Sequence, residues 1–258
     1  MVSAAAVRFA MGVLGNIISL FLFLSPVPTF IGICKKGSVE QYSPVPYLAT
    51  FINCMLWVLY GLPFVHPNSV LVVTINGAGC FIELVYLLLF VIYSGGGGDN
   101  KKRLKVISIS ILEIVIVAVI AAMVLCLAHG THSRSRIVGL IAIACNIMMY
   151  AAPLSVVKMV ITTRSVEYMP FFLSLASFAN GVAWTVYALR PFDPYIFAPN
   201  GLGLLFALAQ LLLYATYYKS TKEQKAARKP KSEMALAQDI VGPEPNKVSH
   251  VSHINQAA

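Results

Sequence analysis

Long apolar stretches alternate with short polar segments along the chain as far as Tyr218. Seven such stretches lie at about 8–32, 45–64, 70–93, 105–128, 136–158, 169–189 and 195–218. Charges are rare inside them, since Glu83 is the only charged residue of 70–93 and Glu113 the only one of 106–127. About 20 apolar residues in a helix cross a bilayer, because the helix satisfies its own backbone hydrogen bonds in hydrocarbon. The pattern predicts an all-α integral membrane protein with seven transmembrane helices.

The composition excludes a soluble domain. Apolar residues make up 58% of the chain and charged residues 11%, with a mean hydropathy of +0.77, whereas soluble domains are about 45–50% apolar and roughly 25% charged. The net charge of +9 does not indicate a nucleic-acid partner, because the basic residues lie in short loops and in the tail, where membrane proteins carry them. Four cysteines lie inside apolar stretches and Cys34 at the end of one, so we expect no disulfide framework.

The polar segments suggest how the chain is divided and oriented. Gly95 to Gly98, followed by a charged run, mark a flexible break, and the composition of 219–258 predicts a disordered tail. Seven spans place the two termini on opposite sides of the membrane. With the N-terminus outside, most of the 19 Lys and Arg residues lie inside, and the outer side holds Arg8, Arg134, Arg136 and Arg190. The positive-inside rule therefore predicts an outer N-terminus and a cytosolic tail.

The chain also resembles itself at a constant offset in the numbering. Ser38-Val39-Glu40 matches Ser165-Val166-Glu167, and Pro26 matches Pro153. Further along, four residues of the second span match four of the sixth: Phe51, Asn53, Trp57 and Tyr60 match Phe178, Asn180, Trp184 and Tyr187. After a slight shortening of the next loop, Asn76-Gly77 matches Asn200-Gly201. Since both tryptophans of the chain fall on matched positions, we infer an internal duplication.

The duplicated unit contains three spans, and the fourth span has no match. An odd number of spans would insert the second copy upside down, so the unmatched span acts as a linker that lets both copies run the same way. We therefore predict a 3+1+3 arrangement of two parallel three-helix bundles. The domains are 1–94 for the first repeat, 95–130 for a cytoplasmic loop with the linker helix, 131–218 for the second repeat, and 219–258 for the tail.

Two Trp–Asn pairs lie at similar depth, one in each repeat. Counting along each span at about 1.5 Å per residue places Trp57 and Asn76, and likewise Trp184 and Asn200, roughly 10 Å below the outer surface. Asparagine facing lipid is costly, so these amides should point inward. An aromatic face and amides that read hydroxyls suit an uncharged polyol such as a sugar. The alternative is that the tryptophans only pack or anchor helices and the asparagines join them.

Other residues are candidates for gating or coupling. Four prolines lie in the cytoplasmic portions of their spans, where they could kink the helices as hinges or, for two of them, only start a helix; they are Pro26, Pro46, Pro153 and Pro170. Tyr60 and Asp193 are both expected at the outer side of the membrane, where a hydrogen bond between them would hold that side of the protein closed. The alternative is that Asp193 is only a turn residue before Pro194. Glu83 and Glu113 are each a possible proton site.

Other functional classes fit less well. The chain has no paired carboxylates, His/Cys cluster or nucleophile triad, so we expect neither an enzyme nor a cofactor. Seven-helix receptors usually carry paired extracellular cysteines and Asp-Arg-Tyr-like or Asn-Pro-x-x-Tyr motifs, which this chain lacks. A retinal protein needs a lysine inside the seventh span, where none occurs. A structural scaffold would not explain the matched Trp–Asn pairs.

The residues resemble the plant SWEET sugar transporters over nearly all of 5–218. The segments that carry the resemblance are Gly15-Asn16, Leu22 to Pro26, Lys36 to Glu40, Asn53 to Gly61, Thr74 to Gly77, Tyr150 to Leu154, Arg164 to Phe171 and Ala198 to Gly201. Parallel repeats are known for this family. The resemblance implies energy-independent, bidirectional sugar transport by alternating access, without a cofactor, in a lipid bilayer and as a homo-oligomer.

The resemblance also implies roles for single residues. The sugar-binding positions are Trp57, Asn76, Trp184 and Asn200, and the size-selective positions are Ser19, Leu22, Asn53, Asn146, Met149 and Asn180. The proline tetrad is Pro26, Pro46, Pro153 and Pro170, and the outer gate is Tyr60 with Asp193. Under the offset Pro46 faces Leu173, and Pro170 faces Ser43, so the tetrad is not fully symmetric.

Two further expectations concern the substrate and the membrane. The bulky pocket residues Leu22, Asn53, Met149 and Asn180 favour a hexose, glucose first, over sucrose, because family members that carry sucrose tend to have smaller residues there. A sucrose carrier and a proton-coupled transporter remain alternatives. The plasma membrane is the expected location, with a vacuolar or other internal membrane as the alternative.

Overall fold

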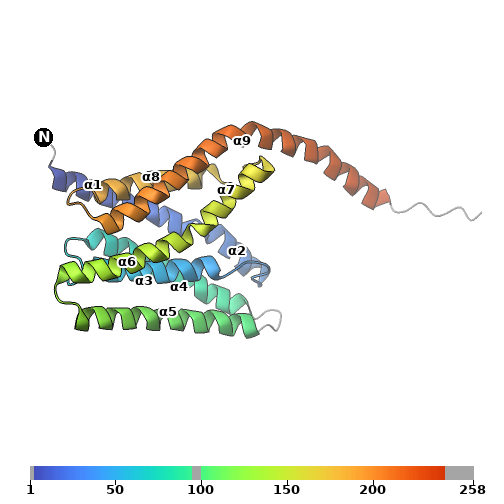
Figure 1. Ribbon diagram of the computed structural model, residues 1–258. Helices are drawn as coiled ribbons and strands as arrows, with labels where there is room; N and C mark the ends of the chain where they lie inside the picture. Colours follow the sequence, from blue (N-terminus) through green and yellow to red (C-terminus); the bar gives the residue numbers. More distant parts are fainter. Residues whose placement is uncertain (1–2, 95–99, 242–258) are drawn as a thin grey trace, which may run out of the picture.

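The computed structural model describes residues 3–94 and 100–241, which form nine helices and no strand longer than an isolated bridge. The helices are α1 (Ala4–Leu24), α2 (Val27–Lys36), α3 (Val45–Gly61), α4 (Val70–Tyr93), α5 (Asn100–Leu127), α6 (Thr131–Met149), α7 (Ala151–Thr163), α8 (Phe171–Tyr187) and α9 (Pro194–Val241). Because α1 continues into α2 and α6 into α7, they make seven membrane segments (Figure 1). The chain is therefore the all-α integral membrane protein with seven spans that its hydropathy predicts.

Five of the seven segments are long and apolar enough to cross a membrane by length and composition. The other two, α3 and α8, have 17 residues each. At about 1.5 Å per residue they lie at the short end of the range for a transmembrane helix. These short helices occupy matched positions in the two repeats. A middle helix shorter than its two neighbours is therefore a feature of the repeated three-helix unit.

Proline accounts for the two broken segments. Pro26 has no N–H to give to the carbonyl of Leu22, which instead accepts hydrogen bonds from Ser25 N (3.1 Å) and Ser25 Oγ (2.7 Å), so α1 ends there. The matched Pro153 lies in the first turn of α7, and Tyr150 N bonds back to Ile147 O (3.1 Å), closing α6. The first and fifth segments therefore bend at the same depth in both repeats.

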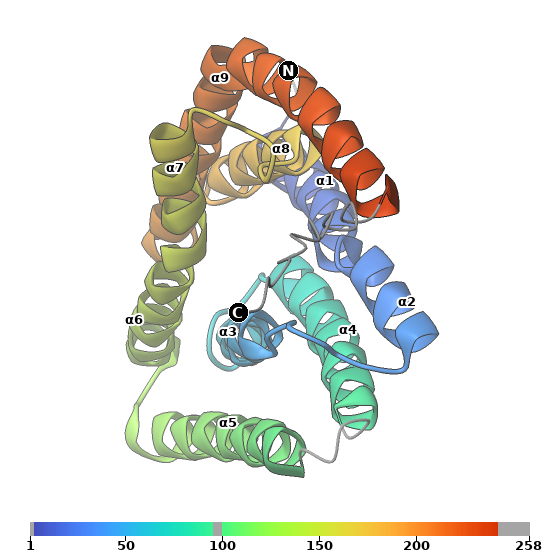
Figure 2. The ribbon, with the colours of Figure 1, turned by 90° about the vertical axis from the view of Figure 1, so that its right-hand side faces the viewer.

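The helices form two bundles of the same internal order. In the first, α4 packs against both α1 and α3; in the second, α9 packs against both α6 and α8. The bundles meet along two seams, where α1 contacts α8 and α3 contacts α6 (Figure 2). α5 runs antiparallel to α6 outside this ring and contacts α3, α4 and α6 (Figure 1). This is the predicted 3+1+3 arrangement.

The end of the molecule that holds Tyr60 and Asp193 will be called the latch end, and the opposite end, which holds the loop 37–44 and the loop 164–170, the proline end. The rings of Phe30, Tyr47 and Tyr86 pack together in the first bundle towards the proline end, and those of Phe30 and Tyr86 are stacked with their centroids 4.4 Å apart. A second cluster of buried residues at the latch end includes Trp57, Tyr60, Trp184 and Tyr187 and joins both bundles. The apolar core thus connects the two halves mainly at the latch end.

The prediction of a disordered tail is wrong for residues 219–241, which continue α9 as helix. Thr221 Oγ1 accepts a hydrogen bond from Val166 N (2.8 Å), and Arg228 pairs with Glu167 at 3.0 Å. These contacts attach the extension to the loop between α7 and α8, and the Lys, Glu, Gln, Ala and Arg residues of 222–228 are strong helix formers. Residues 242–258, and the glycines 95–98 expected to be a flexible break, lie outside the described residues.

Close helix packing at Gly181 generates a stability prediction. A Cβ added to Gly181 would lie 3.0 Å from the Cα and 3.2 Å from the N of Leu204, which are backbone atoms of α9 that cannot rotate away. We expect Gly181→Val to lower the free energy of unfolding by about 1–3 kcal/mol through overpacking, measured as a lower thermal unfolding midpoint in detergent.

The matched control for this substitution is Gly201→Ala on α9, because nothing lies within 4 Å of a Cβ at Gly201. Alanine is the better helix former, so this variant should be at least as stable as the parent protein. Equal stability of Gly181→Val and the parent would contradict the close approach of α8 and α9.

Candidate functional site

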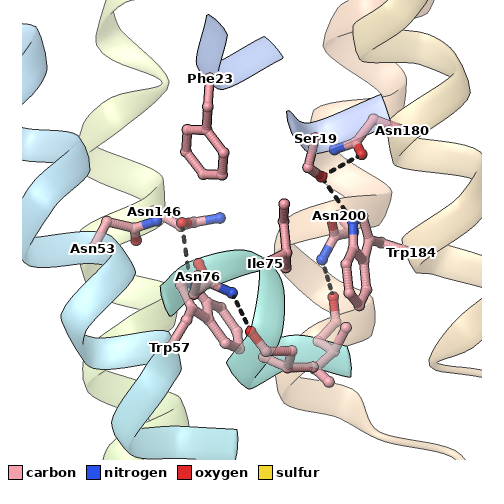
Figure 3. Close-up of a pocket in the computed structure, with 12 residues that line it drawn as sticks. Ser19, Phe23, Asn53, Trp57, Ile75, Asn76, Asn146, Asn180, Trp184 and Asn200 are labelled. Atoms are coloured by element: carbon pink, nitrogen blue, oxygen red, sulfur yellow. Dashed lines mark hydrogen bonds between the residues drawn. The ribbon is translucent and has the colours of Figure 1, made fainter. Parts of the chain in front are cut away.

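A cavity of about 160 Å³ lies between the two bundles and is lined by residues of α1, α3, α4, α6, α8 and α9 (Figure 3). Eight of the predicted site residues line it: Ser19, Asn53, Trp57, Asn76, Asn146, Asn180, Trp184 and Asn200. Four apolar residues that sequence analysis missed complete the wall: Phe23, Val72, Ile75 and Ile196. The fold therefore brings the matched residues of both repeats to one place.

The two indoles bind across the seams to matched positions. Trp57 Nε1 donates to Asn146 Oδ1 (3.4 Å), and Trp184 Nε1 donates to Ser19 Oγ (3.2 Å). The offset of the duplication carries Ser19 onto Asn146, so each bundle's tryptophan bonds the same position of the other bundle. Ser19 in turn donates to Asn180 Oδ1 (2.7 Å). These bonds hold both indoles at the cavity with their faces in its wall (Figure 3).

The two deep amides are held in the same way in both repeats. Asn76 Nδ2 donates to Val72 O (2.9 Å) and Asn200 Nδ2 donates to Ile196 O (2.8 Å), in each case one turn earlier in the same helix. One N–H of each amide is used, which fixes the side chain and leaves Oδ1 and the second N–H for a ligand. The matched bonds orient both amides into the cavity (Figure 3).

One polar atom of the wall lacks a partner. Asn53 Oδ1 is buried and accepts no hydrogen bond from the described residues, which costs about 1–3 kcal/mol for a buried acceptor. Its counterpart Asn180 is satisfied by Ser19. A ligand hydroxyl donating to Asn53 would remove this penalty.

The cavity carries no charge, since no Asp, Glu, Lys or Arg is among its lining residues. Its wall offers two indole faces, an apolar strip and five asparagine side chains. Such a wall fits an uncharged molecule with several hydroxyls, because apolar ring faces stack on indole and hydroxyls both donate to and accept from amides. A metal site does not fit this wall, and no metal-binding group of His, Cys, Asp and Glu occurs among the described residues.

A second cavity, of about 270 Å³, adjoins the first towards the proline end. The two share Asn146, Asn180 and Asn200, and the second also reaches Leu22 and Pro153. Met149, predicted as a size-selective residue, lines neither cavity and is half-buried at the end of α6. The central cavity thus continues towards the proline end.

The latch end is closed by the predicted pair. Tyr60 OH donates to the carboxylate of Asp193, at 2.9 Å from each oxygen, and both residues are buried. Asp193 Oδ1 also accepts the backbone N–H groups of Tyr195 (3.0 Å) and Ile196 (3.2 Å). The carboxylate therefore caps the start of α9 and binds α3 of the other bundle at once.

His66, which sequence analysis missed, completes this contact. Its Nε2 lies 3.2 Å from Asp193 Oδ2, its Nδ1 lies 3.0 Å from Ser135 Oγ, and its ring stacks on Tyr60 at 4.8 Å. Burial lowers the pKa of His66, and the carboxylate of Asp193 opposes that shift. The His66 ring thus connects Asp193, which precedes α9, to Ser135 of α6 at the latch end.

The four predicted gate prolines lie towards the proline end but in two different settings. Pro26 and Pro153 stand at the bends of the first and fifth segments and are half-buried. Pro46 lies in the first turn of α3 and Pro170 is the N-cap of α8, both exposed. The second pair thus starts helices, which is the alternative that sequence analysis left open for them.

Glu83 and Glu113 lie away from the cavity. Both are buried, at 4% and 8% exposure, and each has an Oε2 atom without a hydrogen-bond partner among the described residues. Neither lines the central cavity or its extension. A proton on either carboxyl would therefore not touch a ligand in the cavity directly.

Helical spacing could have found most of the missed lining residues. Phe23 lies one turn after Ser19, and Val72 and Ile196 lie one turn before Asn76 and Asn200. Residues one turn apart share a helix face, so extending each predicted site residue by one turn would have added these three.

Comparison with known proteins matches this chain to one family. The family described as "Sugar efflux transporter for intercellular exchange" matches residues 9–96 and again 136–222. The starts of the two matches are related by the same offset that carries Pro26 onto Pro153 in the internal duplication. The family unit is therefore the three-span repeat.

Individual relatives are similar over most of their length. The Bidirectional sugar transporter SWEET4 of Oryza sativa subsp. indica is 60% identical over 231 residues, covering 90% of this chain and 88% of the relative. The Bidirectional sugar transporter SWEET7 of Arabidopsis thaliana is 56% identical over 221 residues, covering 86% and 84%. A solved structure, described as a eukaryotic SWEET transporter at 3.7 Å resolution, superposes with a TM-score of 0.80 at 39% identity, covering 84% of this chain and 99% of that one.

The closed latch gives a prediction for Tyr60. Replacing it by Phe removes a donor from the buried, charged Asp193, and bonds of this kind contribute about 1.5–3 kcal/mol. We expect Tyr60→Phe to lower the thermal unfolding midpoint in detergent.

The neighbouring Tyr195→Phe is the control, because its ring lies 6.1 Å from that of Tyr60 and no hydroxyl hydrogen bond of Tyr195 is described. It should leave the midpoint near that of the parent. If both variants lost equal stability, the Tyr60–Asp193 bond would not hold this end closed.

Proposed function

This chain belongs to the SWEET family of sugar transporters, and on that premise we propose that it is a bidirectional uniporter that moves hexoses, glucose first, across a membrane by alternating access. The family assignment makes it a membrane transporter and not an enzyme. The single observation that carries the finer proposal is the uncharged cavity between the bundles, with matched indoles and amides from both repeats.

In the proposed binding mode the sugar lies between Trp57 and Trp184. Its apolar ring face stacks on indole, while its hydroxyls meet the free oxygens and N–H groups of Asn76 and Asn200. A hydroxyl also satisfies Asn53 Oδ1. Because these groups would otherwise stay buried and unpaired, the site rejects molecules of the same shape that lack hydroxyls.

In the proposed transport cycle the bundles rock about this site. The observed state has Tyr60 bound to Asp193, and the cavity continues towards the proline end past Pro153. Opening the latch end requires this bond and the His66 contacts to break while the proline end closes. The proposed hinges are Pro26 and Pro153. They lie at matched bends, where proline interrupts the backbone hydrogen bonds of the helix.

The hexose preference rests on the bulk of the cavity wall. Leu22, Asn53 and Asn180 narrow the cavity and its extension. A disaccharide would need room for a second ring, so a single ring is the better fit. Since Met149 lines neither cavity, the proposal does not rest on it.

The setting of the protein is also a proposal. The positive charges in the last turn of α2, at the start of α5 and in the α9 extension favour a cytosolic proline end and an N-terminus outside, in the plasma membrane. A homo-oligomer is proposed from the family resemblance alone. Transport without proton coupling is favoured because Glu83 and Glu113 lie outside the cavity.

The site assignment predicts the effect of removing one deep amide. Asn76→Ala or Asn200→Ala should abolish sugar transport, because each removes a donor and an acceptor from the sugar's hydroxyls. Transport is measured as uptake of labelled glucose in transporter-deficient cells, with surface expression quantified in parallel.

Leu205→Ala is the control, since Leu205 lies on the same helix as Asn200 with 62% of its side chain exposed, away from the cavity. It should transport like the parent protein. Parent rates from either asparagine variant at equal surface expression would remove the site assignment.

The substrate proposal predicts the outcome of a flux assay with the full chain in proteoliposomes. Glucose should enter and leave at comparable rates, sucrose should be transported far more slowly, and a pH gradient should not drive glucose above its equilibrium level. The reason is a single-ring cavity without an ionisable lining residue. Robust sucrose transport without glucose transport would end the hexose proposal, and accumulation driven by the pH gradient would end the uniport proposal.

A further inference from the structure

The latch end has two seams between the bundles, and they are built from matched positions. The seam between α3 and α6 holds Tyr60, His66, Ser135 and Asp193, which are joined by the contacts described above. The internal duplication carries Tyr60 and Ser135 to Tyr187 and Arg8 at the seam between α1 and α8. Asp193 corresponds to Ser69, since each immediately precedes the helix that carries the deep asparagine, and Arg190 lies in the loop that corresponds to the loop of His66.

The exchange reverses the charge of the seam. The carboxylate of Asp193 is replaced by the hydroxyl of Ser69, and Arg8 takes the place of Ser135. The loop of the second repeat adds a further guanidinium group, Arg190, where the loop of the first repeat holds His66. The α3–α6 seam has its own anion to bind the tyrosine of the opposite bundle, and the α1–α8 seam has two cations and no anion at the matched positions.

The contacts of the α1–α8 seam are correspondingly incomplete. Arg8 Nη2 donates to Tyr187 OH (3.2 Å), and the guanidinium lies 4.4 Å from the ring centroid of Tyr187. Arg8 Nε and Ser69 Oγ are buried without a hydrogen-bond partner among the described residues. Arg190 is exposed and forms no hydrogen bond or ion pair with the described part of the chain. Unpaired donors of this kind favour an anionic acceptor.

A cavity of about 570 Å³ lies at these arginines. Both Arg8 and Arg190 line it, no Asp or Glu does, and the rest of its wall is mainly apolar, with Phe9 and Val70 among the lining residues. Phe9 and Val70 are 64% and 63% exposed, so in a membrane protein their side chains face the acyl chains. A second cavity, of about 380 Å³, reaches the same two arginines from the α8 side.

We propose that this cavity binds a membrane lipid with an anionic, phosphate-bearing headgroup. The phosphate accepts hydrogen bonds from Arg8 and Arg190, whose planar guanidinium groups match phosphate oxygens. The acyl chain lies along the apolar wall at Phe9 and Val70. Helix ends lie at the depth of the lipid headgroups, so the charged and apolar parts of the cavity are at the levels that one lipid occupies.

The bound lipid completes the α1–α8 seam as Asp193 completes the α3–α6 seam. Its phosphate bridges Arg8 of the first bundle and Arg190 of the second, and so favours the closed latch end. This binding does not depend on which sugar is transported, and it is measured without transport, so its failure and that of the proposed function are distinguishable.

The test is a lipid titration of the purified full chain in a neutral detergent. Dioleoylphosphatidylglycerol should raise the thermal unfolding midpoint in a saturable way, whereas dioleoylphosphatidylcholine and inorganic phosphate should not. Arg190→Gln should weaken the apparent affinity for phosphatidylglycerol about fivefold, the effect of one arginine near an anionic lipid. Without lipid this variant should unfold like the parent, because Arg190 has no described partner to lose.

Arg136→Gln is the matched control. Arg136 is exposed at the same end of the molecule, and it lines neither arginine cavity. It should bind phosphatidylglycerol like the parent. The proposal is overturned if Arg190→Gln binds like the parent, if Arg136→Gln is weakened equally, if phosphatidylcholine acts like phosphatidylglycerol, or if inorganic phosphate alone produces the shift.

Discussion

The structure depends on the reciprocal hydrogen bonds that each bundle's indole makes with the other bundle. Trp57 donates to Asn146 and Trp184 donates to Ser19, at positions that the duplication makes equivalent. A buried N–H without an acceptor is costly in an apolar interior, so each half needs the other to satisfy its own tryptophan. These bonds hold the bundles at a fixed spacing around a cavity whose wall is polar but uncharged.

The two ends of the molecule are built differently, although the bundles share one plan. At the latch end the carboxylate of Asp193 serves α9 as a cap and α3 as an acceptor. A single charged group therefore couples the start of one bundle's helix to the other bundle. At the proline end the helices are interrupted at Pro26 and Pro153, where the proposed cycle has its hinges. A closed end opposite interrupted helices fits the alternating-access cycle proposed for this chain.

Duplication with divergence explains the charge difference between the two seams. Both seams descend from one set of positions, yet one acquired a carboxylate and the other two arginines. If an anionic lipid binds Arg8 and Arg190 as proposed, the stability of the α1–α8 seam depends on how much of that lipid the membrane contains.

The sequence alone determined the number of spans, the parallel repeat and the matched Trp–Asn pairs. These features are linear, since hydropathy and a constant offset between matched residues can be read without distances. The prediction of a disordered tail was wrong for 219–241, because it rested on polar composition alone. That composition does not reveal that the segment contacts Glu167, which lies far away in the sequence. Only the tertiary structure decided which end is closed, that Met149 lies outside the cavity wall, and that Arg8 and Arg190 share a cavity. Each of these depends on how residues far apart in the chain approach one another, and the packing of helices sets that approach.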